Sequence, residues 1–490
     1  MGLQGGQGTP AGPLVMARFQ GPDSPSVPHP ITDPDKETTM RTFRHSQGLP
    51  CALTLTALAA GLLAALPAAA TNGMNMEGYG PISTGMGGAS QAMDHGTAAM
   101  AQNPATLALG GPGARVDVAL GLLGPDVRSS AGPFSAKSGG TSYVMPAFGY
   151  VRRNGDLTYG IGMFAQGGMG TEYGANTFLA AGSGEPVRSE LGVGRVLLPL
   201  AWNVTPDFAV GATLDFMWAG LDLRMAAPAS DLGALVTGGS GNLIAGLGAT
   251  LPTLPAGTWA RIDFSDSSDF TGKAKSTGWA AKLGMVWRTS PTFTVGASYQ
   301  LESSLGDMKT GSGGAGLSIQ GMGTIPGRIT VVDFQWPSML AVGAAWQVTP
   351  SVLLAADVKR IGWKGVMKDF RMKFDSTAAP FDGSVSFALP QNWRDETVTN
   401  LGIAWQATPA LTLRAGANLS SNPIPEAFVN PLFPATEEDH YTLGLGYKLS
   451  GAGEINASLT MAPKVTVTNG QGVTVTHRQT NVQLMYSHRF

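Results

Sequence analysis

Four stretches of the chain repeat one arrangement of apolar and polar positions. In each, an alternating run ends in a tryptophan, three residues lead to a proline, and a second alternating run begins. The four copies are Trp202–Pro206, Trp287–Pro291, Trp346–Pro350 and Trp405–Pro409. Alternation with a period of two predicts β-strands with one apolar face and one more polar face. The chain is therefore expected to contain successive strands that turn at these prolines.

The residues at the end of each run indicate the surroundings of the strands. Thr-Pro or Ser-Pro favours a tight turn, because proline fixes its φ and cannot donate a hydrogen bond to a ladder. A tryptophan just before the turn suits a membrane interface, which favours an apolar ring with one polar N–H. A soluble β-sandwich would also alternate, but it gives no reason for the recurring tryptophan. The pattern predicts an all-β fold, a transmembrane antiparallel β-barrel.

The connections between runs predict the number of strands. Two further tight turns are Arg152–Asp156, which contains the strong hairpin pair Asn-Gly, and Ser450–Gly453. The other connections are longer and are expected to be irregular: 124–140, 168–189, 221–273, 306–336, 362–392, 421–439 and 463–475. Six short turns and seven long loops predict about 14 strands, and 12 or 16 remain open. An even number, with short periplasmic turns and long outer loops, is typical of bacterial outer-membrane barrels.

The last run also has the character of a barrel strand. Its residues on one face are Val482, Leu484, Tyr486, His488 and Phe490. An alternating strand that ends in phenylalanine resembles the C-terminal signal of proteins inserted by the barrel assembly machinery. This machinery is therefore an expected partner, through Phe490. The alternative is an edge strand that ends in phenylalanine by chance.

Composition agrees with a membrane barrel and excludes several other classes. Charged residues are 13% of the 490 residues, well below the ~25% of ordinary globular chains. A net charge of −2 without a dense Lys/Arg run argues against a nucleic-acid partner. The only cysteine, Cys51, lies in a segment that is expected to be removed, which leaves no thiol for disulfides or metal ligation. We expect no cofactor and no metal.

The first 70 residues are expected to be separate from the folded protein. Residues 1–39 are rich in proline and glycine and are expected to be a disordered or untranslated extension. Residues 40–70 have a positive start, an apolar run and an Ala-x-Ala ending, the pattern of a secretory signal peptide. The apolar run, 52–66, is shorter than the ~20 residues that a spanning helix needs. Thr71 is the expected mature N-terminus.

The segment before the first strand carries motifs of a known family. Residues 71–113 are rich in Gly, Ala and Met without alternation, whereas residues 114–490, the predicted barrel, alternate. The motifs are Gly78-Tyr-Gly, Gly85-Met-Gly-Gly-Ala and Ala98-Ala-Met-Ala-Gln-Asn-Pro-Ala. Together with the strand count and the final strand, they resemble the FadL family of outer-membrane channels for long-chain fatty acids and other hydrophobic compounds.

This resemblance implies that residues 71–113 form a hatch, a small plug domain inside the barrel lumen. The family's hatch ends in an Asn-Pro-Ala element, which corresponds to Asn103, Pro104 and Ala105. We therefore expect these three residues to anchor the hatch. An ordinary Asn-Pro turn is the alternative interpretation.

A second motif is similar to the glycine-rich break at the end of the family's third strand. It implies a lateral gate formed by Gly167, Gly168, Gly170, Glu172 and Tyr173. Glycine favours a bulge or a missing ladder bond, and in a closed barrel such a break leaves an opening in the wall. The alternative is that the glycines simply open a loop.

The long connection 221–273 has apolar residues at helical spacing, which predicts two short amphipathic helices. The residues are Leu232, Leu235, Val236, Leu243, Ile244 and Leu247. Apolar side chains on an external loop need a partner. They form either an external substrate groove, shared with the loop 306–336, or a self-packed cover over the barrel mouth.

Charged residues on the inward parity of the strands are expected to face the lumen. They are Asp117, Arg195, Asp215, Lys282, Asp357, Lys359 and Arg414. An Arg or Lys that faced lipid at mid-depth would cost ~2–4 kcal/mol. Most should pair with one another and with the hatch, while one or two cations could meet a carboxylate headgroup.

The resemblance implies a multi-pass channel of the Gram-negative outer membrane, and not an enzyme. It would take up long-chain fatty acids or aromatic hydrocarbons passively, through an external groove, a pocket gated by the hatch and a lateral exit at the third strand. The expected surroundings are membrane lipid and lipopolysaccharide, and the expected state is a monomer.

Two other functions are alternatives to this one. A general diffusion porin predicts an open polar lumen, which the long segment before the first strand disfavours. An outer-membrane enzyme is disfavoured because His95 beside Asp94 has no nucleophile motif around it and no Gly-x-Ser-x-Gly elbow occurs.

Overall fold

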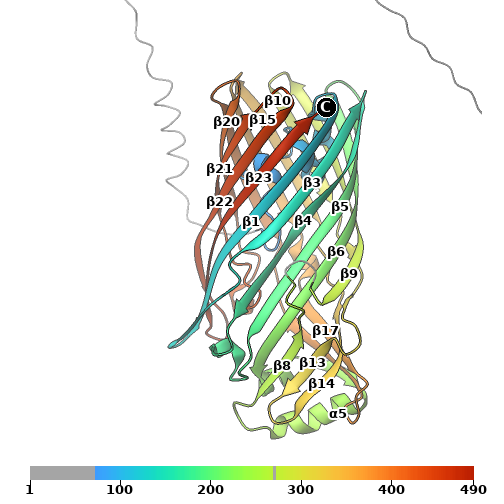
Figure 1. Cartoon of the computed structure of the whole chain (residues 1–490), viewed down its shortest axis with the longest axis vertical. Helices are drawn as coiled ribbons and strands as arrows, with labels where there is room; N and C mark the ends of the chain where they lie inside the picture. The colour runs from blue at the N-terminus through green and yellow to red at the C-terminus, as the bar shows by residue number, and fades with distance from the viewer. Residues whose placement is uncertain (1–71, 269–271) are drawn as a thin grey trace, which may run out of the picture. The chain divides into compact units, whose positions relative to one another are not determined.

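The computed structural model describes residues 72–268 and 272–490. The predicted extension 1–39, the predicted signal peptide 40–70 and Thr71 lie outside these residues. The described part of the chain folds as an antiparallel β-barrel (Figure 1). No helix within the described residues is long and apolar enough to cross a membrane.

The barrel wall is a closed ring in which each strand pairs with two neighbours. The strands in ring order are β1 (Gly113–Ala131), β3 (Tyr143–Asn154), β4 (Leu157–Tyr173), β5 (Val187–Asn203), β6 (Phe208–Pro228), β9 (Ala274–Ser290), β10 (Phe293–Gln300), β15 (Met339–Thr349), β16 (Val352–Ile361), β19 (Glu396–Gln406), β20 (Leu411–Ser420), β21 (His440–Lys448), β22 (Gly453–Thr468) and β23 (Thr474–Arg489). β23 closes the ring on β1. The predicted all-β barrel class is confirmed.

The end of the barrel with the short turns carries an aromatic belt. Trp202, Trp287, Trp346 and Trp405 are 49%, 50%, 49% and 49% exposed, so each ring lies on the outer face of its strand. The turns and the C-terminus share this end (Figure 1). Equal exposure at the same position of four hairpins is the arrangement expected for rings at one membrane interface.

The opposite end differs from the prediction, because most of the connections expected to be irregular contain strands. Within the described residues the sheet has 23 strands, of which nine lie outside the ring of fourteen. The nine are β2 (Phe134–Lys137), β7 (Val236–Ser240), β8 (Trp259–Phe264), β11 (Ser304–Leu305), β12 (Met308–Lys309), β13 (Ala315–Ile319), β14 (Gly323–Val332), β17 (Asp369–Ser376) and β18 (Gly383–Pro390).

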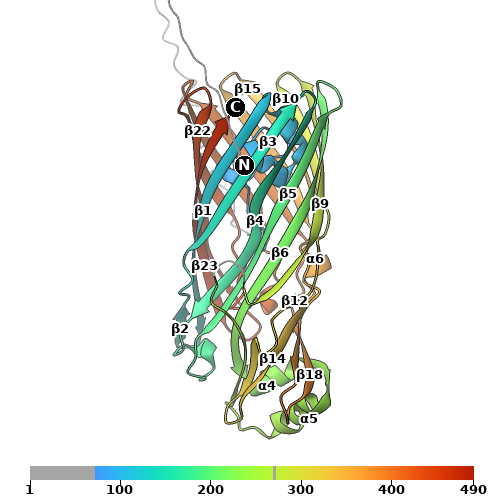
Figure 2. The same ribbon diagram turned by 45° about the vertical axis from the view of Figure 1, so that its right-hand side comes forward.

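These outer strands extend the sheet beyond the barrel rather than folding as loops. The ladder runs from β6 through β8, β13, β14, β17 and β18 to β7. Its inner face buries Ile329, Phe374 and Phe387, so apolar alternation continues outside the membrane wall. Figure 2 shows the short helices α4 (Ala229–Ala234) and α5 (Gly241–Thr250) at this end and α6 (Trp363–Val366) above them, beside the wall. The remaining short helices outside the inner segment are η3 (Phe178–Ala180), η4 (Leu251–Thr253) and η5 (Glu426–Phe428).

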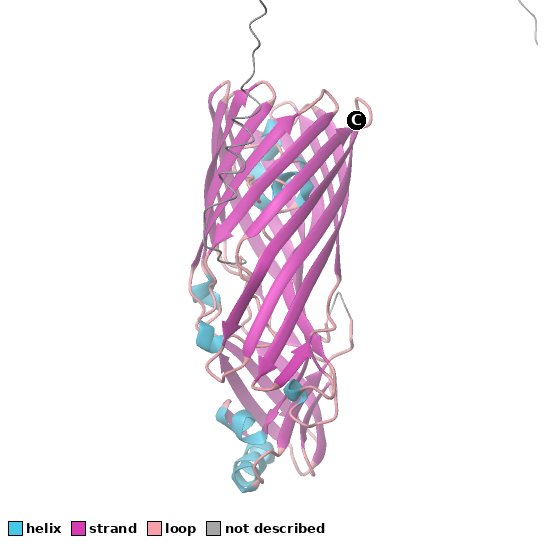
Figure 3. Ribbon diagram, turned by 90° about the vertical axis from the view of Figure 1, so that its left-hand side faces the viewer, coloured by secondary structure: helices cyan, strands magenta, loops and turns pink. Residues whose placement is uncertain are grey.

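Residues 72–112 lie inside the barrel, nearer the end with the short turns (Figure 3). Their helices are α2 (Gly80–Thr84), η1 (Gly96–Ala98), α3 (Ala99–Gln102) and η2 (Pro104–Leu109). α2 contacts β21, β22 and β23, η1 contacts β1 and β3, and η2 contacts β5, β6 and β9. Contacts with strands on several sides of the ring place this inner segment in the lumen.

Candidate functional site

A gap in the barrel wall separates the parts of β3 and β4 that are far from their turn. The ladder between these strands begins at the turn and stops at the pair Phe148↔Met163. Both strands continue, to Tyr143 and Tyr173, but there β3 is paired only with β1 and β4 only with β5. Pro146 lies in the part of β3 that is paired with β1 but not with β4. Proline suits a strand edge, because it has no backbone N–H to donate.

The predicted lateral-gate glycines lie on the β4 side of this gap. β4 does not end at them, because Gly168 and Gly170 remain paired with β5. Instead the register shifts between Ala165 and Gly167, so Gln166 bulges from the ladder. β4 therefore separates from β3 at a bulge and continues beyond it as an unbroken strand.

The two predicted residues beyond the glycines fix the end of β4. Tyr173 is buried, and its hydroxyl lies 3.0 Å from Ser129 Oγ and donates to the Pro431 carbonyl at 3.1 Å. Glu172 is exposed, and its backbone N–H donates to Ser138 Oγ at 3.1 Å. These bonds tie the end of β4 to β1 and to two connections near the barrel mouth.

The first described residues lie against the inner side of the bulge. Asn75 forms a β-bridge with Gly167, and the next N–H along β4 donates to the Met74 carbonyl at 3.2 Å. Asn75 Oδ1 accepts bonds from Trp336 Nε1 at 2.8 Å and Gln166 Nε2 at 3.0 Å. Gly167 has a φ of +153°, and a Cβ at this position would collide with the Met74 carbonyl oxygen. Conformation and close approach both require glycine here.

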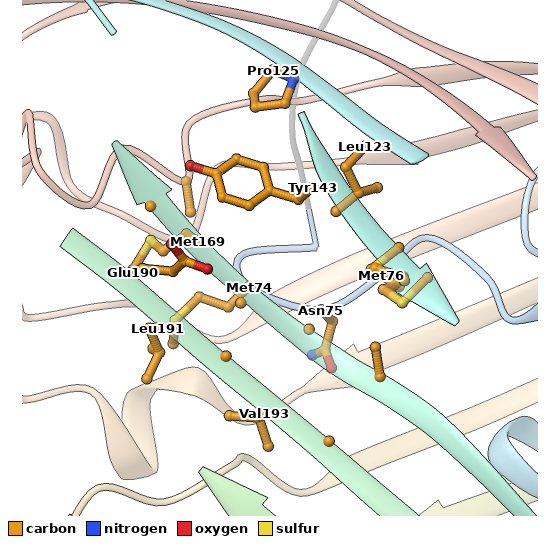
Figure 4. A pocket seen from close by; sticks show the side chains of 18 of the residues that line it. Met74, Asn75, Met76, Leu123, Pro125, Tyr143, Met169, Glu190, Leu191 and Val193 are labelled. Carbon is orange, nitrogen blue, oxygen red and sulfur yellow. The ribbon is translucent and has the colours of Figure 1, made fainter. Parts of the chain in front are cut away.

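A pocket of about 420 Å³ lies between the gap and the inner segment. Residues from both edges of the gap line it, 143–146 from β3 and 163–170 from β4 except Gln166. Much of the rest of its wall is apolar, as with Met74, Leu191 and Trp218. Figure 4 shows Met74, Met169, Leu191 and Tyr143 around this space. Apolar clefts of this size are typical of small-molecule sites.

Asn103 joins the inner segment to the wall. Its Nδ2 donates to the Gln91 carbonyl at 2.8 Å and to the Met285 carbonyl of β9 at 3.0 Å. Its Oδ1 accepts the N–H of Ala105 at 3.1 Å, so Asn103 caps η2, which Pro104 begins. The three predicted residues therefore lie together at one contact between the segment and the wall.

Buried charges of the wall bond the backbone of the inner segment. Asp357 accepts the N–H groups of Ser90 at 2.7 Å and Gln91 at 3.2 Å. Lys282 Nζ donates to the Ala101 carbonyl at 2.5 Å. Further bonds join Arg195 to Ala101 (3.1 Å), Lys359 to Gly88 (3.2 Å), Asp117 to Thr97 (2.8 Å), Arg195 to Asp215 (3.0 Å) and Arg414 to Asn456 (3.0 Å). As expected, most of these charges pair with one another or with the segment.

Asp94 and His95, the pair considered above for catalysis, make contacts that stabilise the inner segment. His95 is buried, its Nδ1 lies 3.0 Å from the Met93 carbonyl, and burial lowers its pKa to about 4. Asp94 Oδ1 accepts the N–H of Gly96 at 2.9 Å. Within the described residues no group of three or more His, Cys, Asp or Glu side chains could hold a metal ion.

Comparison with known proteins decides the family. The model of the family described as "Outer membrane protein transport protein (OMPP1/FadL/TodX)" matches residues 59–487. The chain belongs to this family. It is an outer-membrane β-barrel channel for hydrophobic compounds, and its location is the outer membrane of a Gram-negative cell. The family consists of transport channels, not enzymes.

Solved structures of this family share the fold. The toluene transporter TodX of Pseudomonas putida is 31% identical, with a TM-score of 0.76 over 85% of this chain and 99% of that one. The toluene transporter TbuX of Ralstonia pickettii is 30% identical, with a TM-score of 0.71 over 85% and 99%. A Pseudomonas aeruginosa FadL homologue is 16% identical, with a TM-score of 0.67 over 85% and 100%, and shows the fold alone.

One curated relative matches a shorter part of the chain. An uncharacterized protein in the phosphoenolpyruvate carboxykinase gene 5'region of Chlorobium limicola is 39% identical over 109 residues. The match covers 22% of this chain and 52% of that protein. This chain thus spans about half the length of that relative.

Three of the six apolar residues singled out in the connection 221–273 lie in a buried core. The two short helices are present as α4 and α5. Leu232, Leu243 and Leu247 are at most 3% exposed. Leu235, Val236 and Ile244 are partly buried against the same core. Self-packing therefore describes the three buried leucines, and the external groove stays a prediction for the half-buried residues.

Sequence reasoning missed one edge of the gap and the polar part of the pocket. A proline within an alternating run, Pro146, was the available sign that β3 has an unpaired edge. Glu77, Glu437 and His477 also line the pocket, yet no local pattern marks them. They come from the inner segment, an outer connection and the last strand, which only the closed barrel brings together.

Proposed function

We propose that hydrophobic compounds pass through the pocket and leave sideways, through the gap between β3 and β4, into the lipid of the outer membrane. The observation that carries the proposal is the end of the β3–β4 ladder at Phe148↔Met163, with a pocket lined by residues of both strands where they are no longer paired with each other. Anywhere else in the closed ring, two paired wall strands would have to separate before a molecule could pass sideways into the membrane.

The lateral route avoids a large cost in free energy. Releasing a hydrophobic molecule into the aqueous periplasm costs ~0.8 kcal/mol of transfer free energy for each CH₂ group that is exposed again to water. A molecule that leaves through the wall exchanges an apolar pocket for an apolar membrane. Passive transport then needs no energy source.

We further propose that residues 72–112 act as a hatch. The segment occupies the lumen, is bonded to the wall through Asn103 and Asp357, and meets the gap through Asn75. A general diffusion porin needs an open aqueous lumen, which a bonded segment of this kind obstructs. The hatch would thus direct solutes towards the gap and keep small polar solutes out.

The substrates that suit this pocket best are small aromatic molecules. TodX and TbuX are described as toluene transporters, and both align with nearly the whole barrel. A pocket of about 420 Å³ has room for a single aromatic ring with substituents. Long-chain fatty acids are the other class that the family serves. We also propose that the channel is a monomer and that Phe490, 74% exposed, serves recognition by the barrel assembly machinery.

The proposal is tested by closing the gap reversibly. In the protein without Cys51, which lies in the predicted signal peptide, Val144→Cys and Ala165→Cys place one thiol on each edge of the gap. A bifunctional methanethiosulfonate reagent then joins the edges through bonds that dithiothreitol cleaves. Uptake of radiolabelled toluene by cells should fall to the level of cells that lack the channel, and should recover after reduction.

The matched control joins the same two strands where they are already paired. Tyr150 and Ile161 are partners in the β3–β4 ladder, so Tyr150→Cys with Ile161→Cys should crosslink without effect on uptake. Normal uptake with the gap joined would reject the lateral route. Replacing the glycines by larger residues is a poorer test, because a Cβ at Gly168 or Gly170 would meet backbone of β5.

A further inference from the structure

Part of the pocket wall is polar, and it offers no free cation. Among the described residues that line the pocket, three are Glu, two are His and none is Lys or Arg. These acidic and imidazole residues are Glu77, Glu190, Glu437, His440 and His477. Besides its apolar residues, the wall carries these carboxylates and imidazoles together with neutral polar side chains such as Asn75 and Gln479.

The positive groups beside the pocket are already paired. Arg188 forms a close ion pair with Glu190. His477 Nε2 lies 2.7 Å from Glu437 Oε1, and its Nδ1 lies 2.9 Å from the Pro434 carbonyl oxygen. A carbonyl oxygen only accepts, so His477 Nδ1 is the donor in its contact with Pro434. His477 Nε2 faces the Glu437 carboxylate, so an anion that approached this ring would also approach a carboxylate.

Four buried polar atoms of the lining side chains have no hydrogen-bond partner among the described residues, and two of them, Glu437 Oε1 and His477 Nε2, face each other in an ion pair. Glu77 Oε1 and His440 Nδ1 make no hydrogen bond with any described residue. Both residues are more than nine-tenths buried, at 5% and 3% exposed. A buried acceptor without a donor is unfavourable, and it is rare unless water or a ligand completes the site. The carboxylate is therefore a candidate for direct contact with a ligand.

We propose that the pocket binds an uncharged hydrophobic molecule with one hydroxyl group, and that Glu77 accepts the hydrogen bond of that hydroxyl. The inference rests on the proposed function, and it narrows the substrate class to neutral aromatic alcohols and phenols alongside plain hydrocarbons. The apolar wall, with Met74, Leu191 and Trp218, packs against the ring. His440 Nδ1 is the second group that the hydroxyl can meet.

The same wall disfavours an anionic headgroup. A carboxylate placed in the pocket would face Glu77 in a medium of low dielectric, where like charges repel strongly. No lining Lys or Arg compensates that repulsion. The inward cations, any of which could have been a headgroup partner, instead bond the inner segment or the wall; they are Arg195, Lys282, Lys359 and Arg414. Ionised fatty acids and aromatic acids should therefore bind poorly.

Three ligands of nearly equal shape test the proposal. Toluene, 4-methylphenol and 4-methylbenzoate share a methyl-substituted ring and differ in one group. At pH 7 the phenol is neutral, since phenolic hydroxyls have a pKa of about 10, and the benzoate is charged, since carboxyl groups have a pKa of about 4. Binding to the purified full chain in amphipol is measured directly by calorimetry for each ligand.

The expected order is 4-methylphenol, then toluene, then 4-methylbenzoate. A hydrogen bond to a carboxylate should make 4-methylphenol bind about tenfold more tightly than toluene, which corresponds to ~1.4 kcal/mol. In Glu77→Leu this preference should disappear while toluene binding remains. Asp94→Asn removes the same charge from the same segment at a residue that does not line the pocket, and it should leave the order unchanged.

The outcomes separate this inference from the proposed function. Equal binding of 4-methylphenol and toluene, a preference that survives Glu77→Leu, or tight binding of 4-methylbenzoate would each overturn the polar site while toluene binding upholds the channel. Binding of 4-methylphenol without toluene would support the polar site and contradict a hydrocarbon channel. Binding of none of the three would refute both.

Discussion

Removing one carboxylate should loosen the inner segment. Asp357 on β16 is 2% exposed and accepts the N–H groups of Ser90 and Gln91, at 2.7 and 3.2 Å. Asp357→Ala leaves both donors without an acceptor and removes one of the two carboxylates near Lys359, the other being Glu77. The side chain does not line the pocket, so the substitution acts on the attachment of the segment and not on the substrate route.

The magnitude follows from the two lost bonds. A buried donor without an acceptor costs ~1–3 kcal/mol, so two cost ~2–6 kcal/mol, with the lower part of the range expected where water can reach the space left. A loss of ~3 kcal/mol raises the released population of the segment about 150-fold. Asp357→Asn keeps one acceptor oxygen and should have a smaller effect.

The assay is permeability to a small polar solute. Liposomes that contain the purified full chain are tested for swelling in arabinose, and Asp357→Ala should swell faster than the unchanged protein. Asp126→Ala is the control, because it removes the same charge from an ion pair with Lys137 and Arg478 on the outer face. If Asp357→Ala folds, as judged by heat-modifiability on gels, and does not swell faster, residues 72–112 do not act as a hatch.

Three further predictions test the bulge, the aromatic belt and the topology. Gly167→Ala should detach the bridge to Asn75 at the bulge and speed hydrogen exchange of the Gly168 amide. Gly192→Ala on β5, where a Cβ has open space, should leave that exchange unchanged. Equal exchange rates in the two variants would contradict the close approach of Met74 to Gly167. Trp346→Ala should lower the free energy of unfolding in bilayers by ~2 kcal/mol, as half-exposed rings in lipid contribute apolar contact, and no measurable change would argue against an interface position. A thiol at Ser240→Cys should be labelled on intact cells and one at Pro206→Cys should not, and the reverse result would invert the barrel in the membrane.

Much of the barrel was predictable because its information is local. The four Trp–Pro turns mark strand ends, and alternation marks the two faces of each strand. The prediction of loops for the outer sheet was wrong, because it treated every long connection between barrel strands as irregular. Residues such as Ile329 and Val331 continue the alternation there, so the pattern was present and its length was misjudged.

The candidate site was predictable only in part, because it depends on closure of the ring. The motif around Gly167 locates the bulge, but the gap also needs Pro146 on the neighbouring strand, and the missing ladder between them appears only once the register is known. The leucines of α5 show the opposite problem. Their spacing predicts a helix, yet it cannot tell a buried face from an exposed groove, and Leu243 and Leu247 face a core.

The most direct test of the lateral route is to locate a bound aromatic hydrocarbon in the protein. Crystals of the channel soaked with 4-iodotoluene, measured at a wavelength where iodine scatters anomalously, show the position of the ligand without reliance on weak density. The account predicts an iodine peak in the pocket bounded by Met74, Leu191 and Trp218, behind the gap between β3 and β4. Peaks found only elsewhere in the lumen or at the outer sheet, from a protein that takes up 4-iodotoluene normally, would contradict it.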